Sequence, residues 1–148
     1  MSRSSALALT IGGVTVLGVA AAFAVPAAKD WYDTRHQQTS AYSTGAEAKR
    51  ERTSVPRWLP DEATSVKYSM KTTGGQRVLV ASLADGKLPA QCKPLTGSSP
   101  DAELATDWFP KDVKGKATAK CGLYYAYNDG NTLTAWATHQ EWIDADAP

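Results

Sequence analysis

The sequence lacks the residue sets on which most catalytic and metal sites depend. It has only two cysteines and two histidines in 148 residues, and the cysteines are too far apart for a zinc-site pair. His36 lies in a polar stretch. His139 lies near Glu141 and Asp144 at the end of an expected strand, and such a position is usually a solvated strand end rather than a site. Catalysis needs a base near a nucleophile, paired carboxylates or shared metal ligands. We therefore expect no enzyme, no catalytic residue, no metal and no cofactor, and a hydrolase built on His139 is the weakest alternative.

An excess of charge of one sign is also missing. The formal net charge is +1, whereas nucleic-acid binding domains carry a basic footprint. The glycine pairs at 12–13 and 74–75 lack the strand-to-helix setting of a phosphate-binding loop. We expect no nucleic acid or nucleotide among the partners, and nothing in the sequence indicates an oligomeric state.

One long apolar run is present, near the N-terminus. Ala6 to Val25 contains no charged residue, and about 20 helical residues span the roughly 30 Å hydrocarbon core of a bilayer. Arg3 precedes the run, which predicts that the start stays in the cytoplasm. The sequence thus predicts a single-pass protein of a bacterial cytoplasmic membrane, with its transmembrane helix within 1–28 and its C-terminal domain outside the cytoplasm. The membrane-spanning residues include Ala6, Leu9, Leu17 and Val25.

A cleaved signal peptide is the competing interpretation of this run. Ala22-Phe23-Ala24 fits the small-x-small pattern of a cleavage site. Retention is favoured because the run is long enough to span a bilayer and because Trp31 and Tyr32 suit the membrane interface. Cleavage at Ala24 would give a secreted soluble protein instead.

The rest of the sequence is expected to form a stalk, one folded domain and a tail. Residues 29–54 are polar and have no sustained apolar stripe, so they are predicted to be a stalk that buries no core. The folded domain is expected at 55–143, and residues 144–148 are expected to form an acidic tail.

Two hairpins are predicted in the folded part. Val66, Tyr68 and Met70 alternate with polar residues, as in a strand with one wet face. A turn at Gly74-Gly75 would place Met70 opposite Leu79.

The second hairpin is expected to run from Cys121 to Asn128 and back from Asn131 to His139, with a type I′ turn at Asp129-Gly130. This turn would place Leu123 opposite Trp136, on the face of Cys121. Both faces are apolar, so the hairpin should be central in the sheet, or be covered by the middle segment or by another protein.

The middle segment, 84–119, is rich in Pro, Gly, Ser and Lys. A short helix or a loop is expected here, because Ser99 suits a helix cap and Pro100 the first helical position, with a stop at Pro110. The expected fold class is α+β and β-dominated: a small antiparallel sheet of two hairpins, with one short helix or loop packed on it.

The two cysteines are expected to form a structural disulfide. Cys92 follows the second expected strand and Cys121 opens the third. A bridge would close a loop of about 30 residues and stabilise the domain by about 3 kcal/mol. The oxidising side of a membrane permits it.

Aromatic residues are numerous, with five tryptophans and six tyrosines. Leu123, Tyr125 and Trp136 are assigned to the core. Trp58, Tyr124 and Trp142 form the candidate binding surface, because exposed rings bind protein partners or cell-wall sugars.

Two short stretches, 56–64 (PRWLPDEAT) and 83–89 (LADGKLP), followed by Cys92, carry a resemblance. The protein is similar here to small exported or single-pass membrane-anchored proteins of unassigned function from high-GC actinobacteria. The resemblance implies a cell-envelope location and no activity. The expected function is that of a non-enzymatic, membrane-anchored extracytoplasmic domain that binds a protein partner in the envelope. The alternatives are a cell-wall carbohydrate-binding module and a secreted soluble protein.

Overall fold

The computed structural model describes residues 36–146. The expected membrane span with Ala6, Leu9, Leu17 and Val25, the cleavage motif and the interfacial aromatics lie outside these residues. Among the residues described, no helix is long and apolar enough to cross a membrane. The protein divides into two compact units between His36 and Gln37, and the fold below is that of the second unit.

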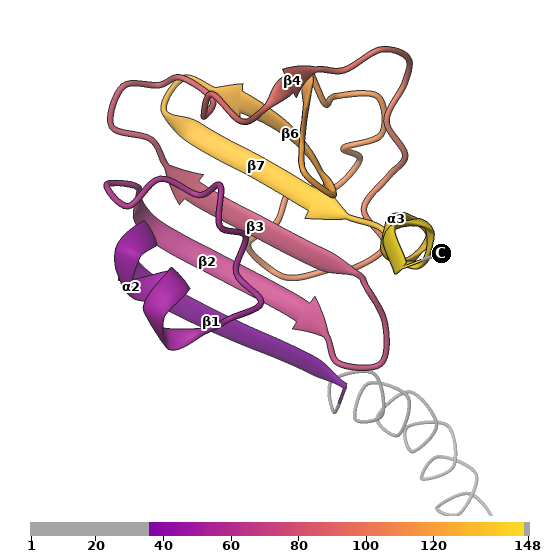
Figure 1. Ribbon diagram of the computed structural model, residues 1–148, viewed down its shortest axis with the longest axis horizontal. Helices are drawn as coiled ribbons and strands as arrows, with labels where there is room; N and C mark the ends of the chain where they lie inside the picture. The colour runs from indigo at the N-terminus through magenta and orange to yellow at the C-terminus, as the bar shows by residue number, and fades with distance from the viewer. Residues whose placement is uncertain (1–35, 147–148) are drawn as a thin grey trace, which may run out of the picture. The chain divides into compact units, whose positions relative to one another are not determined.

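Seven strands form one antiparallel sheet in the order β1-β2-β3-β7-β6-β5-β4 (Figure 1). The strands are β1 (Gln37–Thr44), β2 (Thr64–Lys71), β3 (Arg77–Ser82), β4 (Lys93–Pro94), β5 (Ala119–Cys121), β6 (Tyr124–Asp129) and β7 (Thr132–Ala137). Two short helices, α2 (Gly45–Glu51) and α3 (His139–Asp146), accompany them. The β-dominated α+β class is therefore confirmed.

The folded unit begins earlier than the sequence predicts. Strand β1 pairs with β2 from Gln37 opposite Lys71 to Thr44 opposite Thr64. Thr44 then caps α2, since its hydroxyl accepts the N–H of Glu47 at 3.1 Å. The prediction of a polar stalk over residues 29–54 is thus wrong from Gln37 onward. The sequence hides these elements because β1 buries none of its side chains and α2 buries only two small residues.

The β2–β3 hairpin has a longer turn than expected. Lys71 N–H donates to Gln76 O at 3.0 Å, so residues 72–75 form a four-residue loop. Met70 lies opposite Arg77, and Tyr68 opposite Leu79, which makes the predicted pairing of Met70 with Leu79 wrong by two residues. A shift of two keeps every side chain on its expected face.

The stretch from Cys121 to Asn128 is two strands rather than one. A tight turn at Gly122-Leu123 joins β5 to β6, and Gly122 has φ 59°. Glycine at the first central position permits this positive φ. Cys121 therefore pairs with Tyr124 and lies in the core of the opposite face from Trp136, contrary to the prediction.

The turn between β6 and β7 is also displaced, to Gly130-Asn131. Asp129 pairs with Thr132 across it, so Tyr125 rather than Leu123 lies opposite Trp136. The turn moves by one residue and the register by two, so the two faces keep their expected members within β6 and β7.

Each face of the sheet carries its own core. On one face, Tyr68, Leu79 and Leu133 pack with Val55 and Leu59 from the loop after α2. On the other, Val78 and Trp136 pack with three residues of the middle segment, Leu104, Phe109 and Val113. This segment passes behind the sheet in Figure 1. The hairpin that is apolar on both faces is thus central and covered by the middle segment, as one of the interpretations predicted.

The middle segment packs as a loop, and the helix expected from Ser99 is absent from it. Side chains suited to capping a helix tie the loop to itself instead. Asp101 Oδ1 accepts the N–H groups of Ala102 and Val113, and Ser99 Oγ accepts the N–H of Ala117. The loop alternative is therefore the correct one.

The disulfide between Cys92 and Cys121 is present. It ties the segment just before β4 to the end of β5, and Cys121 is fully buried. At the C-terminus, α3 continues to Asp146, so the first part of the expected acidic tail is helical.

Candidate functional site

The three candidate binding residues meet in one cavity. Trp58 comes from the loop after α2, Tyr124 opens β6, and Trp142 lies on α3. The cavity has a volume of about 410 Å³; we call it the aromatic cavity. Its described lining residues are Thr53, Ser54, Val55, Pro56, Arg57, Trp58, Arg77, Leu123, Tyr124 and Trp142. Sequence reasoning thus found its three rings without knowing that they converge.

The loop that carries Trp58 is fixed by its neighbours. Val55 and Leu59 are buried in the core, and a turn between Pro56 O and Leu59 N–H, at 3.2 Å, leaves Trp58 half-buried. Its ring meets Tyr124 edge-on, with centroids 5.5 Å apart and planes at 74°. The Tyr68 hydroxyl donates to Ser54 O at 3.1 Å and holds the start of the loop against the sheet.

Trp142 is placed by close packing of α3 on the β2–β3 turn. A Cβ added at Gly75 would lie 2.1 Å from Cβ of Trp142, so a side chain at Gly75 would displace the helix. The Gly75 N–H donates to Nδ1 of His139 at 3.2 Å. The His139 N–H in turn donates to Glu103 Oε2 at 2.9 Å, which links α3 to the middle segment. His139 thus has a positioning role at the start of this helix.

Arg77 is the residue that sequence reasoning missed. Its side chain shares the inward face of Leu79 and Ala81, and only 8% of it is exposed. Its guanidinium carbon lies 3.8 Å from the ring centroid of Trp142. The signal in the sequence was the alternation of β3, which places Arg77 on the buried face two residues before Leu79.

Arg77 has no acidic counterpart. Among the described residues it forms no ion pair, and its Nε has no hydrogen-bond partner. Buried charges are normally paired. The other arginine of the cavity, Arg57, is exposed and donates to the backbone carbonyls of Lys49 and Thr53. Arg77 is therefore a buried cation with no carboxylate partner among the described residues, and its charge acts on the neighbouring Tyr124 hydroxyl.

Two more buried polar atoms of the cavity lack partners. They are the indole N–H of Trp58 and the hydroxyl of Tyr124. Burial raises the pKa of Tyr124 strongly, Tyr68 raises it further, and the positive charge of Arg77 lowers it in part. The Tyr124 hydroxyl is thus neutral at physiological pH and remains a hydrogen-bond donor. Unsatisfied buried groups are rare in folded proteins, and three of them lie along this cavity.

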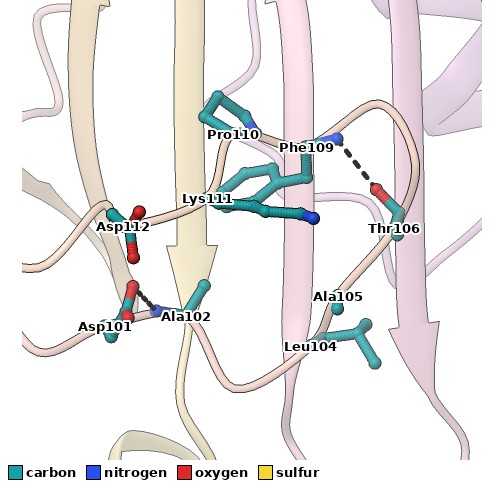
Figure 2. Close-up of a pocket in the computed structure, with 9 residues that line it drawn as sticks. All are labelled: Asp101, Ala102, Leu104, Ala105, Thr106, Phe109, Pro110, Lys111 and Asp112. Atoms are coloured by element: carbon teal, nitrogen blue, oxygen red, sulfur yellow. Dashed lines mark hydrogen bonds between the residues drawn. The ribbon is translucent and has the colours of Figure 1, made fainter.

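A second cavity, of about 300 Å³, lies within the middle segment (Figure 2). Its polar groups are already used within the loop. Asp101 accepts two backbone N–H groups, and the Thr106 hydroxyl accepts the Phe109 N–H at 2.9 Å. This cavity is framed by one segment whose polar groups stabilise its own backbone, so the aromatic cavity is the stronger candidate site.

A charged cluster clamps α3, and hence Trp142, to the sheet. Lys120 Nζ lies 2.7 Å from Glu141 Oε2 and 3.7 Å from the ring centroid of Tyr125. The Tyr125 hydroxyl donates to Glu141 Oε1. Burial together with this hydrogen bond raises the pKa of Tyr125 to about 12. Burial alone would raise the pKa of Glu141, but the bonds from Lys120 and Tyr125 outweigh it and lower that pKa below the ordinary 4.5.

We expect acid to loosen this clamp. Because the folded-state pKa of Glu141 is below its unfolded value, its contribution is complete above about pH 4.5 and is lost as the pH falls through the lowered pKa. The NMR indole N–H signal of Trp142, followed from about pH 6 to about pH 3, should move toward its unfolded position. In Glu141→Gln this acid-dependent step should be missing. Identical profiles for the two proteins would show that Glu141 does not control the helix.

Within residues 36–146, no group of three His, Cys, Asp or Glu side chains is placed to hold a metal ion. Comparison of the sequence and structure with protein-family models, with curated proteins and with solved structures finds no match. The aromatic cavity is therefore the feature from which a function has to be inferred.

Proposed function

We propose that this protein is a non-enzymatic binding domain that the Ala6–Val25 segment holds outside the cytoplasmic membrane, where it binds a protein partner of the cell envelope in the aromatic cavity. One observation carries the proposal: Trp58, Tyr124 and Trp142 converge around a buried, unpaired Arg77. Trp, Tyr and Arg are the residue types that contribute most of the binding energy at protein interfaces. Binding rather than turnover is the role that such an arrangement supports.

The way the rings lie favours a protein partner over a sugar. A stacking platform presents free, roughly parallel ring faces. Here Trp58 and Tyr124 stand at 74° to each other, Tyr124 is only 4% exposed, and Arg77 lies over one face of Trp142. These rings line an open pocket into which a side chain can pack. The cell-wall carbohydrate module remains the second candidate and is an outcome of the tests below.

Support for a protein partner comes from the aromatic cavity and not from the central hairpin. The apolar second face of the central hairpin is covered by Leu104, Phe109 and Val113 of the same molecule, so that face no longer calls for another protein. The aromatic cavity supports a partner instead, because its unpartnered polar atoms lie within the described fold.

Site-specific crosslinking of the full-length protein in its own membranes tests the proposal. A photoreactive amino acid replaces Thr53, which is exposed and lines the cavity. We expect it to capture one discrete protein from the membrane fraction. The same probe at Lys93, exposed on the edge strand β4, should not capture that protein. If the protein is instead released by cleavage at Ala24, the same capture is expected from the secreted fraction.

Matched variants on α3 test whether the capture depends on the aromatic cavity. Trp142→Ala removes a cavity wall and should abolish the adduct, whereas Ile143→Ala removes a neighbouring side chain that is 47% exposed and should leave the adduct intact. Equal capture in both variants, or an adduct to peptidoglycan fragments in place of a protein, would overturn the proposal.

A further inference from the structure

We infer that the partner presents an acidic side chain to the aromatic cavity, so that its carboxylate binds Arg77 while a neighbouring apolar side chain packs against the rings. This inference rests on the proposed function and adds the chemistry of the bound group.

The charges of the cavity favour an anionic ligand group. Of its ten described lining residues, two are arginines and none is Asp or Glu. Arg57 is engaged with backbone carbonyls, which leaves Arg77 as the buried charge without a counterion. A buried cation is stabilised only when paired and hydrogen-bonded, so the complementary ligand group is an anion.

The donors indicate which kind of anion. The guanidinium of Arg77 lies over Trp142 at 3.8 Å, and a planar guanidinium recognises carboxylates through paired N–H groups. The indole N–H of Trp58 adds an unpartnered donor, and the hydroxyl of Tyr124, which interacts with Arg77 and Tyr68, lies beside it. A carboxylate, which only accepts hydrogen bonds when ionised, suits this set.

The source of the carboxylate follows from the same donors. Capture of the terminal carboxylate of a polypeptide uses nests of backbone N–H groups, whereas the unpartnered donors of this cavity belong to side chains. The volume of about 410 Å³ also exceeds what a single carboxylate fills, and Val55, Pro56 and Leu123 supply apolar walls. An acidic side chain beside an apolar one occupies both parts.

Blocked dipeptides test this on the full-length protein in detergent micelles. The probe is acetyl-leucyl-glutamate amide, and acetyl-leucyl-glutamine amide is its neutral counterpart. We expect the glutamate peptide to shift the NMR indole N–H signals of Trp58 and Trp142 with a Kd on the order of 1 mM. The glutamine peptide should bind roughly tenfold more weakly. Added sodium chloride should weaken only the glutamate peptide, because salt screens a charge pair.

Variants and alternative probes complete the test. Arg77→Met should remove the preference for glutamate, and if it does not fold, the salt dependence of the natural protein decides instead. Equal affinities for the two peptides overturn the inference, as does tighter binding of acetyl-leucyl-leucine through its free carboxylate. Binding of N-acetylmuramic acid in place of the peptides also overturns it, in favour of a cell-wall ligand.

Failure of this inference is distinguishable from failure of the proposed function. Two peptides that bind equally at Trp58 and Trp142 would leave a protein-binding cavity with a different specificity. The proposed function fails when the adduct at Thr53 is missing, survives Trp142→Ala unchanged, or joins peptidoglycan fragments in place of a protein.

Discussion

Replacing both Cys92 and Cys121 by alanine is expected to lower the free energy of unfolding by about 3 kcal/mol. The bridge joins residues 29 apart in the sequence and closes a loop that contains most of the middle segment. Without it, the unfolded polypeptide gains the freedom of that loop. Because Cys121 is also fully buried in the core beneath the cavity, part of the loss should come from packing.

Urea denaturation monitored by circular dichroism measures this effect. The natural protein treated with dithiothreitol lacks only the bridge and should unfold at a lower urea concentration than the oxidised protein. The double variant also lacks the buried sulfur of Cys121 and should unfold at a lower concentration still. A double variant as stable as the oxidised protein would show that the middle segment is held by Leu104, Phe109 and Val113 alone.

The side-chain faces of the hairpins could be predicted from the sequence, but their registers could not. Alternation places Tyr68 with Leu79 and Tyr125 with Trp136 on shared faces. Side chains of a strand point to alternate faces of the sheet, and the residue types in the sequence follow that alternation. The turn position depends on which glycines need a positive φ. Gly74 and Gly75 are not among the residues with positive φ, whereas Gly122 and Gly130 are. The Gly74-Gly75 pair therefore misled the register of the first hairpin by two residues. In the second hairpin Gly130 does lie in the turn, but as the first central residue rather than the second.

The elements that the sequence failed to predict are those that bury little. Strand β1 is mostly polar, and its one large apolar side chain, Tyr42, is only partly buried against the core. The strand belongs to the sheet mainly through its pairing with β2, which leaves no trace in composition. Helix α2 packs through Gly45 and Ala48, residues too small to form an apolar stripe. A segment of this kind is recognised only when its pairing partner is known.

The aromatic residues of the cavity could be predicted from the sequence, but their convergence around Arg77 could not. Trp58, Tyr124 and Trp142 could be selected from the sequence as candidate binding aromatics. Arg77 could not, because one arginine at the start of a strand usually indicates a solvated end. Its burial depends on α3 packing over Gly75, a contact between segments more than 60 residues apart.

Trp136→Ala is expected to cost about 3 to 5 kcal/mol, the largest loss from any single change proposed. Trp136 is fully buried in the core that the middle segment covers. Its ring contacts Phe109, Tyr125 and Tyr127 at centroid distances of 6.1 to 6.4 Å. Its indole N–H also donates to Pro100 O at 3.2 Å, so the substitution removes both the packing and the anchor of the loop.

The expected result is a domain in which the middle segment comes away from the sheet first. Limited proteolysis should cut Trp136→Ala between residues 100 and 113 at concentrations of denaturant that leave the natural protein intact. Trp108→Ala is the matched control, because Trp108 is only half-buried and contacts Phe109 from the rim of the same core; it should cost less than half as much. Equal losses from the two variants would mean that the segment is held by its own turns rather than by Trp136. The aromatic cavity lies on the opposite face, so a Trp136→Ala protein that stays folded should still bind the glutamate peptide.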